Sequence, residues 1–366
     1  MKLILVAGAR PNFMKIAPIL EALRPYRDTR PDFSVLLIHT GQHYDRNMSD
    51  GFFRDLGIPE PDMNLGVGSG SHAEQTGLIM VGFERLCVEQ CPDWVLVVGD
   101  VNSTVACAIT AKKLGIRVAH VEAGLRSRDM TMPEEINRLC TDAIADLLFV
   151  TDIGAAENLR REGVPSDRVH FVGNTMIDSL LRFVNQARSA PLPAGLTDGN
   201  FAVLTLHRPS NVDNRLRIVG ILDALHDVAE RIPIVFPVHP RTLGRLREFG
   251  LLASLEAHEN IRLTDPLSYL PFLGLVSRSR LVLTDSGGIQ EETTVLGIPC
   301  ITLRLNTERP ITCEVGTNVL VGSDPNAIRK AAFSALRSDP HNHRVPEKWD
   351  GRAAERIVDV LMSLPD

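Results

Sequence analysis

Residues Leu281 to Glu292 read L-V-L-T-D-S-G-G-I-Q-E-E, an apolar strand that passes through Ser286, Gly287 and Gly288 into a predicted helix. Such a turn directs unpaired backbone N–H groups and the positive end of the helix dipole at one point, which favours an anion such as a diphosphate. Glu292 lies one helical turn inside, so its carboxylate can return to the same place and accept hydrogen bonds from ribose. The pattern indicates a nucleotide site, although an ordinary βα turn whose glycines only permit tight packing is the alternative.

The composition is that of a globular protein with two domains. The chain has 366 residues, too many for one typical core, with 44% hydrophobic and 23% charged residues. No apolar run reaches the ~18 residues of a membrane span, and the first apolar run is too short for a secretory signal. We therefore predict a cytoplasmic protein whose six cysteines, which lack C-x-x-C spacing, stay reduced. The net charge of −6, without a basic block, gives no signature of nucleic-acid binding.

Short apolar, β-branched segments alternate with longer amphipathic ones along the whole chain. Because strands that are apolar on both faces belong to sheets covered by helices, the pattern predicts an α/β fold with parallel sheets. A composition break at 190–199 lies just after the predicted boundary, which divides the chain into lobes at 1–172 and 173–350. A final helix at 351–366 could lie on either lobe. Polar residues follow nearly every strand, and ligands bind at that edge of open sheets, so we expect a cleft between two facing sets of loops.

Three carboxylates of the first lobe lie at strand ends or at a helix start. Asp100 follows one apolar strand, Glu122 follows the next, and Glu134 opens a helix. A buried carboxylate is costly unless it is paired or used, so three converging acids indicate a site. They could act as general acids and bases or hold Mg²⁺, and the residues alone leave both open. The acids at the helix start also have a purely structural explanation. Negative charge is favourable at a helix N-terminus, and Glu135 can form a local ion pair with Arg138.

Basic residues also follow strands in both lobes. Arg10 and Lys15 flank the first turn, G-A-R-P-N-F-M-K, which matches neither the P-loop nor the dinucleotide fingerprint, so a NAD requirement loses its main support. His207 ends the first strand of the second lobe, and His239 and Arg309 follow later strands. Each could contact phosphate, although a solvated cation or a structural histidine is the simpler interpretation.

Taken together, the motifs resemble those of the non-hydrolysing UDP-N-acetylglucosamine 2-epimerases. The shared motifs, in order from residue 3 to about residue 322, include G-A-R-P-N-F-M-K, H-T-G-Q-H, G-D-x-N-S-T, H-V-E-A-G-L-R-S, M-P-E-E-I-N-R, H-R-P-S-N, P-V-H-P-R, L-T-D-S-G-G-I-Q-E-E and T-E-R-P. The resemblance implies two Rossmann-like lobes of the GT-B type, with the final helix returning to the N-terminal lobe. It also implies a cytoplasmic homodimer that needs neither a cofactor nor a metal.

The implied reaction interconverts UDP-N-acetylglucosamine and UDP-N-acetylmannosamine. UDP leaves C1 as the C2 proton is removed, which gives a 2-acetamidoglucal. UDP then adds back to C1 and a proton adds to C2 on the opposite face. By similarity Asp100, Glu122 and Glu134 are the acid/base candidates, and His207 is a catalytic candidate that handles the diphosphate with Arg10. The other implied contacts are Ser286, Gly287 and Gly288 at the diphosphate, Glu292 at the ribose, Phe272 near the uracil if it does not simply fill core, and Lys15, Arg138 and Arg309.

A related branch of the family offers a second sugar as the substrate. This branch acts on UDP-2,3-diacetamido-2,3-dideoxyglucuronic acid and shares a Gly-Ala-Arg-Pro opening and a similar region around Gln42 and His43. Some bacterial relatives bind a second UDP-N-acetylglucosamine as an allosteric activator through residues such as Gln42 and His239, which is a further hypothesis here. The competing functions are a UDP-sugar glycosyltransferase on the same lobes and a non-catalytic nucleotide-sugar sensor, and neither requires three carboxylates.

Overall fold

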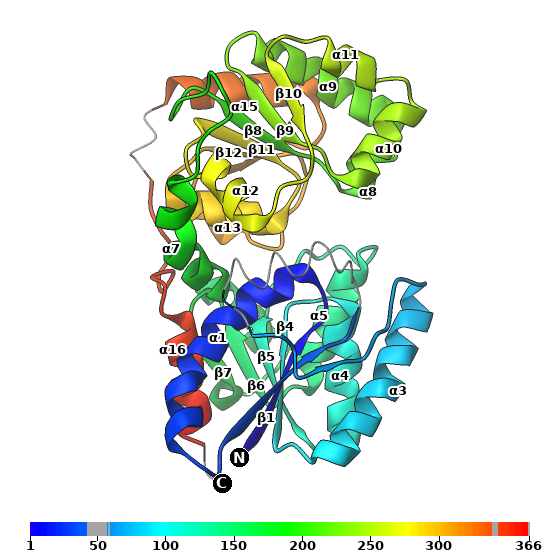
Figure 1. Cartoon of the computed structure of the whole chain (residues 1–366), viewed down its shortest axis with the longest axis vertical. Helices are drawn as coiled ribbons and strands as arrows, with labels where there is room; N and C mark the ends of the chain where they lie inside the picture. Colours follow the sequence, from blue (N-terminus) through cyan, green and yellow to red (C-terminus); the bar gives the residue numbers. More distant parts are fainter. Residues whose placement is uncertain (42–56, 58, 339–342, 365–366) are drawn as a thin grey trace. The chain divides into compact units, whose positions relative to one another are not determined.

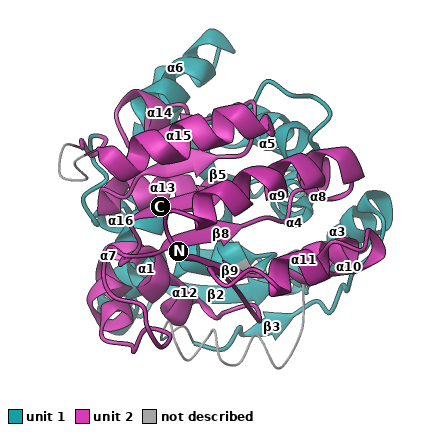
Figure 2. Cartoon of the chain, turned by 90° about the horizontal axis from the view of Figure 1, so that it is seen from above, with its two compact units in different colours: residues 1–179, 347–366 teal, residues 180–346 magenta. Residues whose placement is uncertain are grey.

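The structure, a computed structural model, describes residues 1–41, 57, 59–338 and 343–364. These residues form two compact units, one of residues 1–179 with 347–366 and the other of residues 180–346 (Figures 1 and 2). Every strand pairing within the described ranges is parallel, and helices alternate with strands. The predicted α/β class with two parallel sheets is therefore confirmed. Within these ranges, no helix combines the length and the apolar character needed to cross a lipid bilayer.

The sheet of the first unit has the strand order β3-β2-β1-β4-β5-β6-β7. Its strands are β1 (Lys2–Ala7), β2 (Ser34–His39), β3 (Met63–Asn64), β4 (Trp94–Val98), β5 (Arg117–Ala123), β6 (Leu147–Val150) and β7 (Val169–Phe171). Its helices are α1 (Arg10–Thr29), α3 (His72–Gln90), α4 (Asn102–Lys113), α5 (Pro133–Ile144), α6 (Ile153–Arg161), the 3₁₀ helix η1 (Ser166–Arg168) and α16 (Ala353–Met362). Helices α3, α4 and α5 pack side by side, and α1 packs with α16 (Figure 1). Because helices cover both faces, all five residues of β4 are buried.

The second unit has a sheet of order β10-β9-β8-β11-β12-β13. Its strands are β8 (Ala202–Thr205), β9 (Ile234–Pro237), β10 (Ile261–Thr264), β11 (Leu281–Thr284), β12 (Cys300–Thr302) and β13 (Asn318–Leu320). Its helices are α8 (Pro209–Val212), α9 (Arg215–Ala229), α10 (Pro240–Glu248), α11 (Leu252–Glu256), α12 (Tyr269–Val276), α13 (Gly287–Leu296), α14 (Ile311–Glu314) and α15 (Pro325–Arg337), and α7 (Thr175–Arg188) runs from the first unit into it. Alternate residues of its strands belong to two different apolar clusters, one for each face of the sheet.

The strand order reverses once in each sheet. In the first unit the chain leaves β1 for β2 on one side and returns to β4 on the other side, and in the second unit the same reversal separates β8 from β11. Loops that follow these strands diverge at the reversal, which is where open α/β sheets bind ligands. The residues that follow β4 and β11 are therefore the first places to look for chemistry.

The C-terminal segment is fixed to the first unit by hydrogen bonds. Trp349 is buried, and its indole Nε1 donates to the Thr151 carbonyl at 3.0 Å. The Asp178 carboxylate accepts from the backbone N–H groups of Ala353 at 3.1 Å and Ala354 at 2.7 Å, so it satisfies two donors at the start of α16. Burial raises the pKa of Asp178 to about 6 against the lowering effect of these two bonds. The last helix is thus an integral part of this unit.

Gly173 makes the close approach of the C-terminal segment possible. It has a φ of +94°, and a Cβ at this position would collide with the carbonyl of Lys348. Gly163 has a similar φ of +82° but open space around it. We expect Gly173→Ala to lower the free energy of unfolding by about 3 kcal/mol, from backbone strain plus overpacking, and Gly163→Ala by only about 1 kcal/mol. Urea unfolding of both variants measures this, and equal losses would show that Lys348 does not pack there.

Candidate active site

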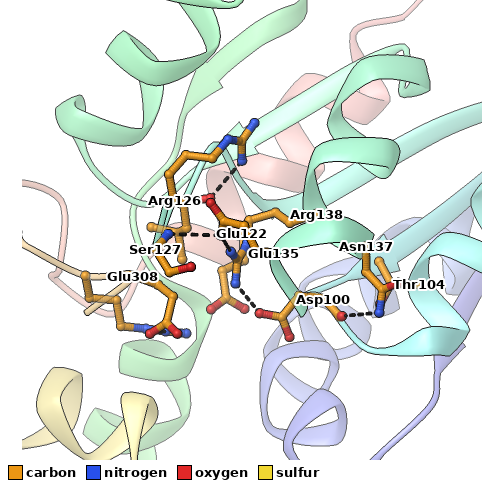
Figure 3. Close-up of polar contacts among 12 residues, drawn as sticks. Asp100, Thr104, Glu122, Arg126, Ser127, Glu135, Asn137, Arg138 and Glu308 are labelled. Atoms are coloured by element: carbon orange, nitrogen blue, oxygen red, sulfur yellow. Dashed lines mark hydrogen bonds and ion pairs between the residues drawn. The ribbon is translucent and has the colours of Figure 1, made fainter. Parts of the chain in front are cut away.

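Arg138 bridges two carboxylates behind the carboxyl end of β4. Gly99, with a φ of +68°, turns the chain out of the sheet, and Asp100 follows it. The Asp100 carboxylate, whose side chain is 24% exposed, contacts one guanidinium nitrogen of Arg138, which is itself buried (Figure 3). A second nitrogen of Arg138 donates to Glu135 at 2.6 Å, which confirms the expected local ion pair. Arg138 therefore fixes Asp100 at the edge of the sheet.

Glu135 also anchors the loop that leads into α5. Its buried carboxylate accepts from the backbone N–H groups of Ser127 and Arg128, both at 2.9 Å. With Arg138 as a third donor, the hydrogen-bonding capacity of this acid is largely used inside the protein. Glu135 is therefore a structural acid, although it is the direct neighbour of the candidate Glu134.

Glu122 occupies a strained position in β5. It has a φ of +72°, and the pairing of β5 with β6 shifts by one residue between Val121 and Ala123, which marks a bulge. Bulges re-aim side chains, and a left-handed conformation at a residue with a Cβ costs on the order of 1–3 kcal/mol. The Glu122 carboxylate is buried and contacts the Nζ atom of Lys15 in α1. Lys15, implied by the family resemblance to complete the substrate site, thus neutralises this acid.

The turn at Gly99 brings the two acids to the same place. A Cβ at Gly99 would lie 3.0 Å from Lys15 Nζ and 3.5 Å from Glu122 Oε2. Since Asp100 is the next residue, this turn places Asp100 close to Glu122 along the carboxyl edge of the sheet (Figure 3). Each carboxylate forms an ion pair with a buried cation, Asp100 with Arg138 and Glu122 with Lys15. The negative charges of the two acids are therefore compensated.

A buried network of charged and polar side chains holds the backbone around Asp100 and Glu122 in place. His120 has no exposed surface, and its ring lies 2.7 Å from Asp142 Oδ1 through Nδ1 and 2.8 Å from the Gly99 carbonyl through Nε2. Asp142 also accepts from Gly124 N at 3.0 Å and contacts Arg126 at 2.7 Å. Although burial alone would raise the pKa of Asp142, His120 and Arg126 outweigh it and hold that pKa below its usual range. The network holds the backbone on both sides of the acid pair.

Glu134 lies apart from that pair, on a hollow of about 260 Å³ in the same unit. The hollow is also lined by His72, Gln75, Asn102 and Asn137. Asn137 Nδ2 donates to the Asp100 carbonyl at 2.9 Å, so the wall of the hollow adjoins the Asp100 turn (Figure 3). Among the described residues, no hydrogen bond or ion pair engages the Glu134 carboxylate. It is therefore available to a ligand.

The described residues contain no group of three His, Cys, Asp or Glu side chains arranged to hold a metal ion. Asp100 and Glu122 are instead neutralised by Arg138 and Lys15. Each of the two acids thus has its own cationic partner, which places the carboxylates in distinct environments.

In the second unit, the start of α13 carries the features of an anion site. Ser286 is the N-cap residue of the helix, and its backbone N–H donates to Thr284 Oγ1 at 3.0 Å. A Cβ at Gly287 would lie 2.9 Å from Arg309 Nη1, so the guanidinium rests against the first turn. Arg309 also pairs with Glu291 at 2.6 Å. The structure therefore brings Ser286, Gly287 and Arg309 together, and a helix N-terminus beside a guanidinium attracts anions.

Glu292 and Phe272 lie in different surroundings on α13 and α12. Glu292 is buried, and burial raises its pKa to about 7 against the lowering effect of a hydrogen bond with Tyr269. An acid with such a pKa at a ligand site is a candidate binding or catalytic group. Phe272 is partly buried and packs against the apolar cluster that contains Phe201 and Leu275, which fits the core-filling alternative.

Asp285 positions His207 next to the start of α13. The buried Asp285 carboxylate accepts from the backbone N–H groups of His207 at 3.1 Å and Arg208 at 2.9 Å, and lies 2.8 Å from His207 Nδ1. Burial would raise the pKa of Asp285, but the hydrogen bond with His207 holds it below its usual range. The His207 ring lies 5.8 Å from that of His239, whose pKa is lowered by burial and by His207. The two imidazoles therefore adjoin the anion site.

Several residues that support the candidate site had no role in the sequence interpretation. His120 and Asp285 stand inside the quoted motifs, and a polar residue within or directly after an apolar strand was the signal that could have identified them, whereas Asp142 lies in α5 and carried no such signal. Gln42 and His43 lie outside the described residues, and α1 begins at Arg10, whose side chain is not described.

Comparisons with known proteins identify the family. A family model described as UDP-N-acetylglucosamine 2-epimerase matches residues 27–362. The UDP-N-acetylglucosamine 2-epimerase of Methanocaldococcus jannaschii is 44% identical over 368 residues, which cover 99% of each chain. The UDP-2,3-diacetamido-2,3-dideoxy-D-glucuronate 2-epimerase of Pseudomonas aeruginosa is 42% identical over 369 residues, which cover 100% of each chain. The chain therefore belongs to the UDP-N-acetylglucosamine 2-epimerase family, and it is an epimerase, an isomerase.

A solved structure agrees with this assignment. The crystal structure of Methanocaldococcus jannaschii UDP-GlcNAc 2-epimerase in complex with UDP-GlcNAc and UDP has a TM-score of 0.90 to this chain, at 42% identity and with 99% of each chain covered. The family and the fold class predicted from the motifs are thus confirmed by independent comparisons.

The buried network gives a stability prediction for the first unit. Asp142→Asn removes the charge that compensates Arg126 and weakens the hydrogen bond with His120, so we expect the free energy of unfolding to fall by about 3–5 kcal/mol. Glu157→Gln is the control, because the ion pairs of Glu157 with Arg160 and Arg161 are at the surface and should contribute little. Urea unfolding at neutral pH compares the two variants, and similar small losses in both would mean that the network does not stabilise this edge.

Proposed function

We propose that this epimerase inverts C2 of a UDP-linked 2-acetamido sugar by eliminating UDP and adding it back. The C2 hydrogen is not acidic enough to leave alone, so its removal is coupled to cleavage of the C1–O bond. The products of this step are a 2-acetamidoglucal and free UDP. Re-addition of UDP at C1 and of a proton at C2 on the opposite face completes the inversion, and the atoms and charges balance without a redox step.

The acids of the first unit are the proposed proton donors and acceptors. Asp100 and Glu122 each pair with a buried cation, whereas Glu134 opens on the hollow without one among the described residues. Carboxyl groups in such different environments suit opposite roles in proton transfer. The observation that carries the proposal is the strained bulge at Glu122, which holds a buried carboxylate against Lys15, next to the Gly99 turn that precedes Asp100. Such strain persists mainly where function requires it.

The second unit supplies the proposed site for UDP. The first turn of α13 and Arg309 would hold the diphosphate, and His207, oriented by Asp285, would stabilise the charge that develops on it as it leaves. Arg10 is proposed to assist at the diphosphate and Glu292 to accept from the ribose. Phe272, which packs against the core but is only partly buried, is proposed to lie near the uracil with its remaining surface. A glycosyltransferase would need the UDP site but would give the acids of the first unit no task.

UDP-N-acetylglucosamine and UDP-N-acetylmannosamine are the proposed substrate pair. Support comes from the relative at 44% identity that bears this substrate's name, while the relative at 42% is named for the diacetamido glucuronate. The second sugar is therefore the alternative substrate. A cytoplasmic homodimer is part of the proposal, as is a second UDP-N-acetylglucosamine that activates through residues such as His239. Hyperbolic kinetics at all substrate concentrations would contradict that activation.

Turnover in D₂O tests the reaction itself. The enzyme is incubated separately with UDP-N-acetylglucosamine and with the diacetamido uronic acid analogue, and the products are analysed by NMR. We expect deuterium at C2 together with the manno epimer for the true substrate. A glycosyltransferase or a sensor would leave C2 protonated with both sugars, and that result would refute the proposal.

Neutralising each acid tests its assigned role. We expect Asp100→Asn, Glu122→Gln and Glu134→Gln each to lower kcat by about 100-fold or more, because positioned acids and bases contribute ~10²- to 10⁴-fold. UDP affinity should persist, since UDP is proposed to bind the other unit. Glu84→Gln, an exposed acid on α3, is the matched control. Near-normal turnover in all three variants would show that other groups transfer the proton.

Glu292→Gln should stabilise the protein at neutral pH but weaken the binding of UDP. Its pKa is raised from 4.5 to about 7 in the folded state, so the stability linked to its protonation is present below pH 4.5 and is lost as pH rises through 7. We expect Glu292→Gln to gain roughly 3 kcal/mol relative to the wild type between pH 4.5 and pH 8, yet to bind UDP about tenfold more weakly.

Urea unfolding and calorimetric titration with UDP measure these two effects. Glu259→Gln, an exposed acid in the same unit, should change neither. A Glu292→Gln variant that binds UDP as tightly as the wild type would remove Glu292 from the proposed site.

A further inference from the structure

The hollow beside Glu134 has a wall of neutral polar side chains that the proposed proton transfer does not use. Asn102 and Gln75 are buried in this wall, His72 stands exposed at the start of α3, and Asn137 projects from α5. The volume of about 260 Å³ is large enough for part of a sugar rather than a single water molecule. All these residues belong to the first unit.

The hydrogen bonds of this wall fix the orientation of each amide. Asn137 Nδ2 donates to the Asp100 carbonyl at 2.9 Å and to Asn102 Oδ1 at 3.2 Å. Asn102 Nδ2 in turn donates to Gln75 Oε1 at 2.8 Å and approaches His72 Nδ1 at 3.1 Å. His72 Nδ1 lies 3.1 Å from Asn102 Nδ2 and 3.4 Å from Asn102 Oδ1, and this oxygen already accepts from Asn137. We therefore assign Nδ1 as the acceptor, which places the ring proton on Nε2.

Two hydrogen-bonding atoms of the wall remain available to a ligand. His72 Nε2–H is a donor and Asn137 Oδ1 is an acceptor, and neither has a partner among the described residues. A secondary amide presents the complementary pair, an N–H donor and a carbonyl acceptor. The lining residues include one carboxylate, Glu134, and no arginine or lysine among those described. The hollow therefore suits a neutral amide and disfavours a carboxylate.

We infer that His72 and Asn137 recognise the N-acyl group of the sugar in this hollow and so determine the preference of the enzyme for a 2-acylamino over a 2-hydroxy sugar. The inference rests on the proposed function, in which Glu134 acts next to C2. His72 donates to the acyl carbonyl, and Asn137 accepts from the amide N–H. Asn137 also holds the Asp100 carbonyl, so the contact that recognises the acyl group is directly linked to the turn that carries Asp100.

Binding of matched ligands tests this inference with a readout other than the rate of turnover. UDP-N-acetylglucosamine, UDP-glucose and UDP are titrated calorimetrically into the wild type and into His72→Phe, His72→Gln and Glu84→Gln. UDP-glucose differs from the first ligand only by a hydroxyl in place of the acetamido group. His72 is exposed, so these variants should fold, which circular dichroism checks.

The wild type should bind UDP-N-acetylglucosamine at least about tenfold more tightly than UDP-glucose. His72→Phe should reduce this preference about fivefold to tenfold with UDP affinity unchanged, because one hydrogen bond to the acyl group is lost. His72→Gln, which keeps an N–H donor, should restore part of it, and Glu84→Gln should behave as the wild type.

Two results would overturn the inference: a wild type without preference between the sugars, or a preference that survives in His72→Phe. An equal loss for UDP and for both sugars would show that His72 acts on the nucleotide site instead. If the D₂O experiment fails while the preference follows His72, the epimerase mechanism is wrong but the hollow is still an acyl-binding site.

Discussion

The cost of buried charge is the constraint on which the candidate active site of the first unit depends. Removing a carboxylate from water costs several kcal/mol unless a cation and hydrogen bonds compensate it. Asp100 and Glu122 meet this requirement through Arg138 and Lys15, and Asp142 meets it through His120 and Arg126. Because the compensating groups come from different helices and strands, this site is stable only when the whole unit has folded around it.

This interlocking gives the acids fixed positions before a substrate arrives. His120 holds the Gly99 carbonyl and Asp142 holds the Gly124 N–H, so the backbone on either side of the acid pair is anchored by the same buried network. Preorganised charges of this kind avoid reorganisation during the reaction, which is a large part of enzymatic rate enhancement. In the second unit Asp285 positions His207 in a similar way. The Asp285 carboxylate contacts both the backbone N–H and the ring of His207.

The sequence predicted the fold class because its signal is local: strands such as β4 are apolar on both faces, and each is followed by an amphipathic helix. It also indicated Asp100 and Glu122, because a carboxylate directly after a buried strand is unusual. It could not show that Lys15 reaches Glu122, 107 residues away, or that Glu122 takes a positive φ, since both depend on packing between distant segments. For the same reason the roles of His120 and Asp142, and the raised pKa of Glu292, emerged only from the structure.

Cleavage of the C1–O bond is the central claim, because it links the acids of one unit to the anion site of the other. Positional isotope exchange tests it most directly: UDP-N-acetylglucosamine is labelled with ¹⁸O in the bridge between C1 and the β-phosphorus and followed by ³¹P NMR during turnover. We predict that the label moves to nonbridging positions of the β-phosphate, since free UDP can rotate before it adds back. If the manno epimer forms while the label stays in the bridge, the bond never breaks and elimination is refuted.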